Sequence, residues 1–209
     1  MLTMRADTIK AGAVVGAVAA LAFAGQAHAA TISSGHVDAL SFTYDPVANE
    51  LGIEVLDHSG PTVYDPANVD FDVHSGHLVN RPSATPCRFD AGDNWVIPRL
   101  ESSGLLWAGW STEELDLDDF GGELHAELTD AVVPSGGNVA IYDAPTNTLR
   151  FHTNSACNAS GTDITESHHH ATWVFTEPGT YELTFQVTGT HTTDGPVTSD
   201  EHTYTFDVG

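Results

Sequence analysis

The chain has 209 residues, 29 of them acidic and only 6 basic, so its formal net charge at pH 7 is −23. Such a surface repels nucleic acids and anionic lipids and concentrates cations, which argues against a nucleic-acid-binding role. The length suits one large domain or at most two small ones.

The first 29 residues predict a cleaved secretory signal peptide. Arg5 and Lys10 supply a positive start, Ala11–Ala24 is apolar, and Ala27–Ala29 reads "AHA", a small-x-small cleavage site. The apolar stretch is too short for a membrane span. We therefore expect residues 30–209 to form the mature chain, secreted and without a membrane span.

Removal of this segment makes the charge balance more extreme. Taking Arg5, Asp7 and Lys10 from 6 basic and 29 acidic residues leaves 4 and 28, a net charge of −24 with no lysine. An acidic surface favours cation binding. The same acidic surface is equally expected of a protein adapted for solubility or for a salty habitat.

Cys87 and Cys157 are the two cysteines of the chain. In an exported protein an even pair of cysteines is typical of a disulfide. Closing a loop of this length is worth about 4 kcal/mol in the chain-entropy account. The alternative, a pair of thiolate metal ligands, is less suited to an oxidising compartment.

Alternation of apolar and polar residues at period two recurs along the mature chain and predicts half-buried strands. In chain order the apolar positions are Leu40, Phe42 and Tyr44; Leu51, Ile53 and Val55; Val69, Phe71 and Val73; Val139 and Ile141; Leu149 and Phe151; Tyr181, Leu183, Phe185 and Val187; and Tyr204, Phe206 and Val208. Ser111–Phe120 resembles a helix start, since Ser111 and Glu114 have capping-box spacing, and predicts one short helical turn. Many short strands separated by turns predict an all-β fold, a single antiparallel β-sandwich of the immunoglobulin-like type.

The segment "SHHHATWVF", residues 167–175, contains three consecutive histidines. On a strand His168 and His170 share one face, about 6.6–6.8 Å apart along the backbone, and His169 takes the other. Two imidazoles at that spacing can converge on one ion at Zn–N distances of about 2.0–2.1 Å. The alternative is a solvated polar loop.

Other histidines occur beside acidic residues. "GHVD" offers His36 and Asp38 two residues apart, "LDHSG" places His58 after a strand, and "DVHSGH" adds His74. A closed zinc site needs about four ligands. The predicted metal ligands are His36, His58, His168 and His170, with Asp38 and His74 as further candidates. Imidazole ligands suit zinc, with copper as the alternative.

The sequence contains no motif typical of an enzyme. A Gly-x-Ser-x-Gly elbow and an HExxH sequence are both absent from the 209 residues. We therefore expect a binding protein. One alternative is a metal-free module that binds glycan or protein through Trp95, Trp107, Trp110 and Tyr142. Another is a zinc or copper enzyme, the copper form requiring cleavage before His28.

Two long stretches resemble a known family. They are "NWVIPRLESSGLLWAGWSTEEL", from Asn94, and "HHHATWVFTEPGTYELTFQVTGT", which runs on to "DGPVTSDEHTYTFDVG". These stretches, with the opening "SGHVDAL", are similar to the actinobacterial surface-anchored protein domain, also called the choice-of-anchor M domain. The resemblance covers essentially all of residues 30–209.

The resemblance implies a role in metal handling. Members are secreted or wall-anchored, are encoded beside metal-type ABC transporters and have been linked with zinc acquisition. The family's two histidines before the tryptophan fall on His168 and His170, and its early HVD falls on His36 and Asp38. The implied partners are a divalent metal ion and the substrate-binding protein of a metal ABC transporter. The chain departs from the family in its cysteine pair, in Arg99 where glutamine is usual, and in lacking a wall-sorting signal, so we expect an extracellular protein without a covalent wall anchor.

Overall fold

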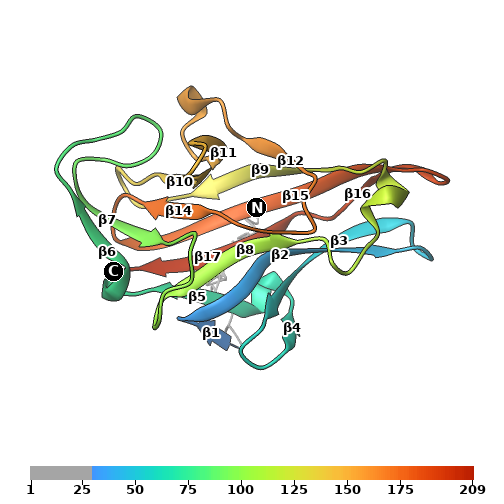
Figure 1. Cartoon of the computed structure of the whole chain (residues 1–209), viewed down its shortest axis with the longest axis horizontal. Helices are drawn as coiled ribbons and strands as arrows, with labels where there is room; N and C mark the ends of the chain where they lie inside the picture. The colour runs from blue at the N-terminus through green and yellow to red at the C-terminus, as the bar shows by residue number, and fades with distance from the viewer. Residues whose placement is uncertain (1–29) are drawn as a thin grey trace, which may run out of the picture.

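The computed structural model describes residues 30–209, and the predicted signal peptide, residues 1–29, lies outside the described residues. The described chain forms 17 β-strands in three sheets and four short 3-10 helices. Figure 1 shows that many of the strands run close to the long axis of the molecule. Within this part of the chain no helix is long and apolar enough to cross a membrane.

The largest sheet has seven strands in the order β1-β5-β17-β15-β9-β12, with β16 paired to β15. Their bounds are β1 (Ala30–Ile32), β5 (Val69–Val73), β17 (His202–Val208), β15 (Gly179–His191), β9 (Leu124–Val132), β12 (Gly161–Ile164) and β16 (Gly195–Thr198). The pairs β1–β5 and β5–β17 are parallel, whereas β15 is antiparallel to β9, β16 and β17.

The other two sheets have five strands each. One has the order β11 (Thr148–His152), β10 (Val139–Asp143), β14 (Thr172–Phe175), β7 (Gly92–Ile97) and β6 (Leu78–Arg81). The other has the order β13 (His168–His170), β8 (Leu106–Ser111), β2 (Gly35–Asp45), β3 (Glu50–Asp57) and β4 (Thr62–Tyr64). The 3-10 helices are η1 (Pro66–Asn68), η2 (Ser75–His77), η3 (Leu117–Phe120) and η4 (Ser155–Cys157).

One hydrophobic core draws on all three sheets. Phe206 of β17 packs against Phe71 of β5, with ring centroids 4.9 Å apart, and against Trp173 of β14, at 5.5 Å. Phe151 of β11 meets Trp110 of β8 edge to face at 6.5 Å. Ring pairs of this kind bury large apolar areas and favour a tilted or edge-on geometry. The aromatic residues of the period-two segments therefore join the sheets.

The all-β prediction is confirmed, and each predicted period-two segment lies in a strand. The antiparallel prediction needs correction, because β1–β5, β5–β17 and β2–β8 are parallel and the strands divide among three sheets. Parallel neighbours require long connections, and the one between β2 and β8 includes β3 to β7. Local alternation carries no information about such pairings.

The single predicted helical turn is also revised. A helical turn, η3, does lie within the predicted segment. Its cap is Asp116 and not the predicted Ser111, because the Asp116 side chain accepts a hydrogen bond from a backbone amide at the start of the turn. Ser111 ends β8 instead. Three further 3-10 turns, η1, η2 and η4, begin after Asp65, His74 and Asn154, whose side chains accept from the amide two residues ahead.

The predicted disulfide between Cys87 and Cys157 is present. It joins the segment before β7 to the end of η4, with the two Cα atoms 5.7 Å apart. His152 lies close enough to both sulfur atoms to form a potential donor group with them. Because the sulfur atoms are bonded to each other, this group offers a single free donor, the imidazole, and no closed metal site.

Candidate metal centre

Strand β8 brings the predicted ligands together, because it lies between β2 and β13 in the third sheet. On one side Asp38 of β2 pairs with Gly109, and on the other side His170 of β13 pairs with the same glycine. Residues two apart on a strand share a face. Gly109 has no side chain, so His36 and Asp38 on β2 can approach His168 and His170 on β13 across β8.

Three imidazole nitrogens converge at this point. His36 Nε2 lies 3.1 Å from His168 Nε2 and 3.1 Å from His170 Nε2. A neutral imidazole nitrogen carries either one hydrogen or one lone pair, so His36 Nε2 cannot form good hydrogen bonds with both neighbours. A cation between the three nitrogens would satisfy all of them at once.

Asp38 supplies a fourth donor. Its Oδ1 atom lies 3.0 Å from His168 Nε2 and 3.4 Å from His36 Nε2. The side chain is fully buried, yet Oδ1 accepts no hydrogen bond from the described residues. Short contacts without hydrogen-bond direction are expected of ligands whose lone pairs point at one ion and not at each other.

The four-donor group has the dimensions of a tetrahedral site. One donor atom from each of His36, Asp38, His168 and His170 lies within 4.8 Å of the other three. A tetrahedron with Zn–N distances of 2.0–2.1 Å has edges of about 3.3 Å. Four of the six donor separations are 3.0–3.4 Å and match that edge, and the other two lie within 4.8 Å. The chemistry and spacing of these donors therefore suit a zinc-sized ion.

His58 lies beside the four donors in a different role. Its Nε2 is 2.8 Å from Asp38 Oδ2, the oxygen that faces away from the other histidines, and its ring stacks on His36 at 3.9 Å and 5°. Its amide donates to the His36 carbonyl. This arrangement orients the carboxylate and one imidazole, as residues behind a metal ligand do.

Trp107 forms one wall of the centre. Its ring stacks on His170 with centroids 3.8 Å apart, and its Nε1 donates to the Arg99 carbonyl at 2.8 Å. Burial lowers the pKa of His170 to about 4, with smaller contributions from His36 and His168. Burial also lowers the pKa of His36, and His58 adds to that effect. Both imidazoles are therefore neutral near pH 7, which is the form that binds metals.

The centre remains open to solvent on one side. The side chains of His36, His58 and His168 are 23%, 31% and 27% exposed, whereas Asp38 is fully buried. A hollow of about 290 Å³ is lined by Arg99, Leu100, Trp107 and the three consecutive histidines. An ion could enter and leave by this side.

Gly109 is a structural requirement of the centre. A Cβ atom there would lie 2.2 Å from the His169 carbonyl oxygen and 2.7 Å from His170 Nδ1. Both distances are far below those of real Cβ contacts, so β13 would have to move. A β-bulge in β2 after Asp38 further adjusts the local geometry, as bulges beside functional sites do.

His169, which was predicted to face away from the ligands, and the candidate His74 both lie outside the centre. His169 points to the opposite face, where its Nε2 is 2.5 Å from Asp143 Oδ1 and its ring stacks on the core residue Trp110. His74 lies outside the four-donor group, because its Nε2 contacts the Gly104 carbonyl and its Nδ1 accepts from the Gly76 amide. The segment that follows His74 forms the 3-10 helix η2, and the His74 imidazole caps the start of this helix.

Sequence patterns predicted no role for Gly109, and they favoured Trp107 as a core residue, with a binding platform as the alternative. The "LLWAGW" segment alternates Trp107 and Gly109 against Leu106, Ala108 and Trp110, three buried residues. This period-two pattern could have identified a strand with Gly109 on its outer face. The four aromatic residues proposed as a platform do not act alike, since Trp110 is fully buried in the core.

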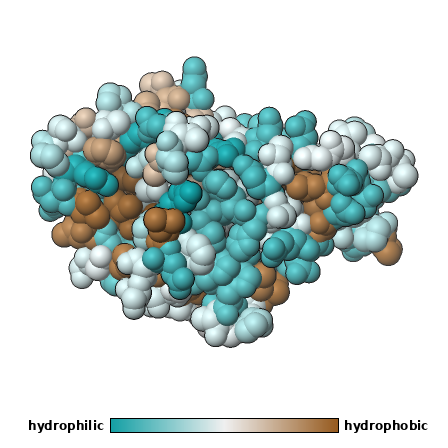
Figure 2. Space-filling view, viewed as in Figure 1, coloured by the Kyte–Doolittle hydropathy of each residue, from teal (hydrophilic) through white to brown (hydrophobic). Residues whose placement is uncertain are grey.

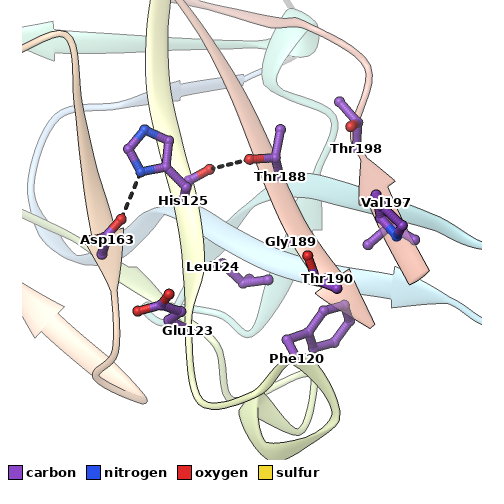
Figure 3. Close-up of a pocket in the computed structure, with 11 residues that line it drawn as sticks. Phe120, Glu123, Leu124, His125, Asp163, Thr188, Gly189, Thr190, Val197 and Thr198 are labelled. Carbon is purple, nitrogen blue, oxygen red and sulfur yellow. Dashed lines mark hydrogen bonds and ion pairs between the residues drawn. The ribbon is translucent and has the colours of Figure 1, made fainter. Parts of the chain in front are cut away.

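A second hollow, of about 360 Å³, lies across β9, β12, β15 and β16. Figure 3 shows His125 turned toward Asp163, whose Oδ1 is 2.8 Å from His125 Nδ1. Both side chains are about half exposed or more, at 49% and 66%. An exposed pair of this kind is weak, so we assign no site here.

Comparisons with known proteins find no match to this chain among family models, curated proteins or solved structures.

Proposed function

We propose that this protein is a secreted divalent-metal-binding protein, with zinc as its metal. The observation that carries the proposal is the convergence of His36, His168 and His170 with the buried Asp38 at donor separations of 3.0–3.4 Å. Three imidazoles and a carboxylate suit zinc, and copper is the alternative because it binds nitrogen donors more strongly.

Binding is favoured over catalysis by the number of donors. A catalytic zinc site keeps a coordination position for water, whereas four protein ligands close the tetrahedron. The partly exposed histidines still leave a route for exchange of the ion. We therefore assign capture and release of the metal, and no reaction.

The sequence resemblance extends the proposal to transport. We propose that residues 30–209 form one domain of the choice-of-anchor M type, an elaborated immunoglobulin-like sandwich that acts outside the cell. It would pass its ion to the substrate-binding protein of a metal ABC transporter. The disulfide is consistent with an oxidising compartment.

Elemental mass spectrometry of the untagged, purified protein tests the metal assignment. The wild-type protein should carry close to one zinc or copper ion per chain after loading and desalting, and His168→Ala/His170→Ala should carry none. His125→Ala/His202→Ala removes two histidines outside the centre and should retain the ion. Equal metal content in the two double variants, or no metal in the wild type after titration, contradicts the proposal.

A further inference from the structure

An apolar groove lies directly beside the candidate metal centre. It has a volume of about 350 Å³ and crosses the face of the second sheet between β6, β7, β10 and β14. Val96, Tyr142 and Val174 form a small hydrophobic cluster on this face, separate from the main core. Figure 2 shows apolar side chains gathered toward the end of the molecule that carries β6 and β7, on a face that is otherwise largely hydrophilic.

The arginines of the mature chain are concentrated at this groove. Arg81 and Arg99 line it, and Arg88 stacks over the ring of Tyr142, which also lines it. The fourth arginine, Arg150, is paired with Asp143 and Glu166. Three of the four basic side chains in residues 30–209 thus surround one groove of a strongly acidic protein.

Arg81 and Arg99 also lack acidic partners. Among the described residues neither guanidinium forms an ion pair, although 28 acidic side chains are available in residues 30–209. Arg81 lies over the ring of Phe89 at 4.7 Å, and its buried Nε has no hydrogen-bond partner. A buried donor without a partner is costly, and a guanidinium fork matches a carboxylate in two parallel hydrogen bonds.

The groove and the metal centre share a boundary. Arg99 and Leu100 line both the groove and the hollow that opens onto the histidines. Trp107, which stacks on His170, holds the Arg99 carbonyl with its indole nitrogen. Leu100 is 70% exposed and stands between the two hollows. A molecule seated in the groove would therefore lie next to the exit of the ion.

We propose that this groove is the docking site for a protein partner, which inserts a segment carrying a carboxylate next to a large apolar side chain. The carboxylate pairs with Arg81 and Arg99, and the apolar side chain fills the groove against Val96 and Tyr142. The role of the partner as metal acceptor rests on the proposed function above, whereas the docking itself does not. The positive groove selects this segment locally, although the whole molecule is negative.

Selection from a random 12-residue peptide library displayed on phage, against the metal-free protein, tests the chemistry. Salt of about 0.15 M screens the long-range charge beyond about 8 Å. The enriched peptides should share an Asp or Glu close to an aromatic or aliphatic residue. No enrichment, or enrichment of peptides without an acidic residue, overturns the proposal.

Affinity measurements with one enriched peptide test whether the peptide binds in the groove. Arg81→Gln/Arg99→Gln should weaken binding at least tenfold, and Arg81→Lys/Arg99→Lys, which keeps the charge, should weaken it less. Val47→Asp/Val63→Asp makes the same charge change at exposed positions outside the groove and should bind normally. Equal binding by the arginine-to-glutamine variant overturns the proposal.

Binding of the same peptide also tests the docking site independently of the proposed metal-binding function. His168→Ala removes a candidate metal ligand that neither lines the groove nor forms the stack on Trp107, which is made by His170, so this variant should bind the peptide like the wild type. If the wild-type protein carries no metal but still binds the peptide through the arginines, the metal proposal fails and the docking site stands.

Discussion

Asp38 Oδ1 lies 3.0 Å from His168 Nε2, although the two residues belong to strands on opposite sides of β8. The contact exists because β8 presents a glycine between them. The geometry of the centre therefore depends on backbone packing as much as on the ligands themselves.

Gly109→Ala should disrupt metal binding without removing a ligand. The added methyl group would meet the His169 carbonyl and the His170 ring, so β13 would be displaced from β8. We expect at least a tenfold loss of zinc affinity, measured by competition with a chromogenic chelator. Gly60→Ala is the matched control, because a Cβ there meets nothing within 4 Å. Unchanged affinity in Gly109→Ala would show that β13 does not position the ligands.

His58→Ala should weaken metal binding without abolishing it. His58 contacts Asp38 Oδ2 and stacks on His36, so its loss frees the carboxylate to rotate. Loss of such a supporting residue costs about 10–100-fold in metal affinity. The stoichiometry should stay at one ion per chain, whereas His36→Ala should lose the ion. Complete loss of metal in His58→Ala would make His58 a ligand itself.

Metal affinity should fall at acid pH, because a protonated imidazole cannot coordinate an ion. Burial lowers the pKa of His170 to about 4 and also lowers the pKa of His36, so protons compete less at these two ligands than at a free imidazole. An unperturbed imidazole titrates at about 6.5, and we expect the Kd to rise mainly below about pH 6. Chelator competition at pH 7.5, 6.5 and 5.0 measures this rise, and equal values at pH 7.5 and 5.0 would contradict imidazole ligation.

His77 should make the stability of the fold depend on pH. It is 1% exposed, its Nδ1 lies 3.0 Å from the Val96 carbonyl, and its Nε2 accepts from the Leu106 amide. Burial lowers its pKa, so the folded protein keeps it neutral while the unfolded chain takes up a proton at about pH 6.5. Its contribution is thus fully present above that pH and is lost as the pH falls below it, by at most about 1.4 kcal/mol per pH unit.

Urea unfolding of the metal-free protein at pH 7.5 and 5.5 measures the effect. His77→Gln should be less stable than the wild type at pH 7.5, by about 1–3 kcal/mol, because buried partners are left unpaired. The variant should also lose less stability between the two pH values. An equal loss of stability between pH 7.5 and 5.5 in the wild type and in His77→Gln would show that His77 does not cause the pH dependence.

Local sequence patterns predicted the strands and the two pairs of candidate ligands, but they did not predict that the two pairs lie next to each other in the fold. His36 with Asp38, and His168 with His170, were visible as residues two apart on strands. Their convergence depends on β2 and β13 flanking β8, which is a long-range pairing that alternation cannot reveal. His74 lies outside the four-donor group for a partly local reason, since the turn that follows it uses Nδ1 as its cap, while Nε2 contacts the distant Gly104 carbonyl.

The burial of Asp38 was equally hidden from the sequence. In a chain with 29 acidic residues, nothing in its neighbourhood distinguishes this one as fully buried. The distribution of the arginines was hidden for the same reason. Arg81 and Arg99 are 18 positions apart, and the fold places both on the rim of one groove.

The wide separation of the candidate ligands along the chain has a consequence for the order of events during folding. His36 and His168 are 132 residues apart, so a chain in synthesis holds at first only the donors of β2. Two donors are too few for a closed zinc site, which needs about four. The four-donor group is therefore complete only after β13 has been synthesised and has docked on β8. Under the proposed function, an incomplete chain would not hold the ion firmly, and only the folded protein would.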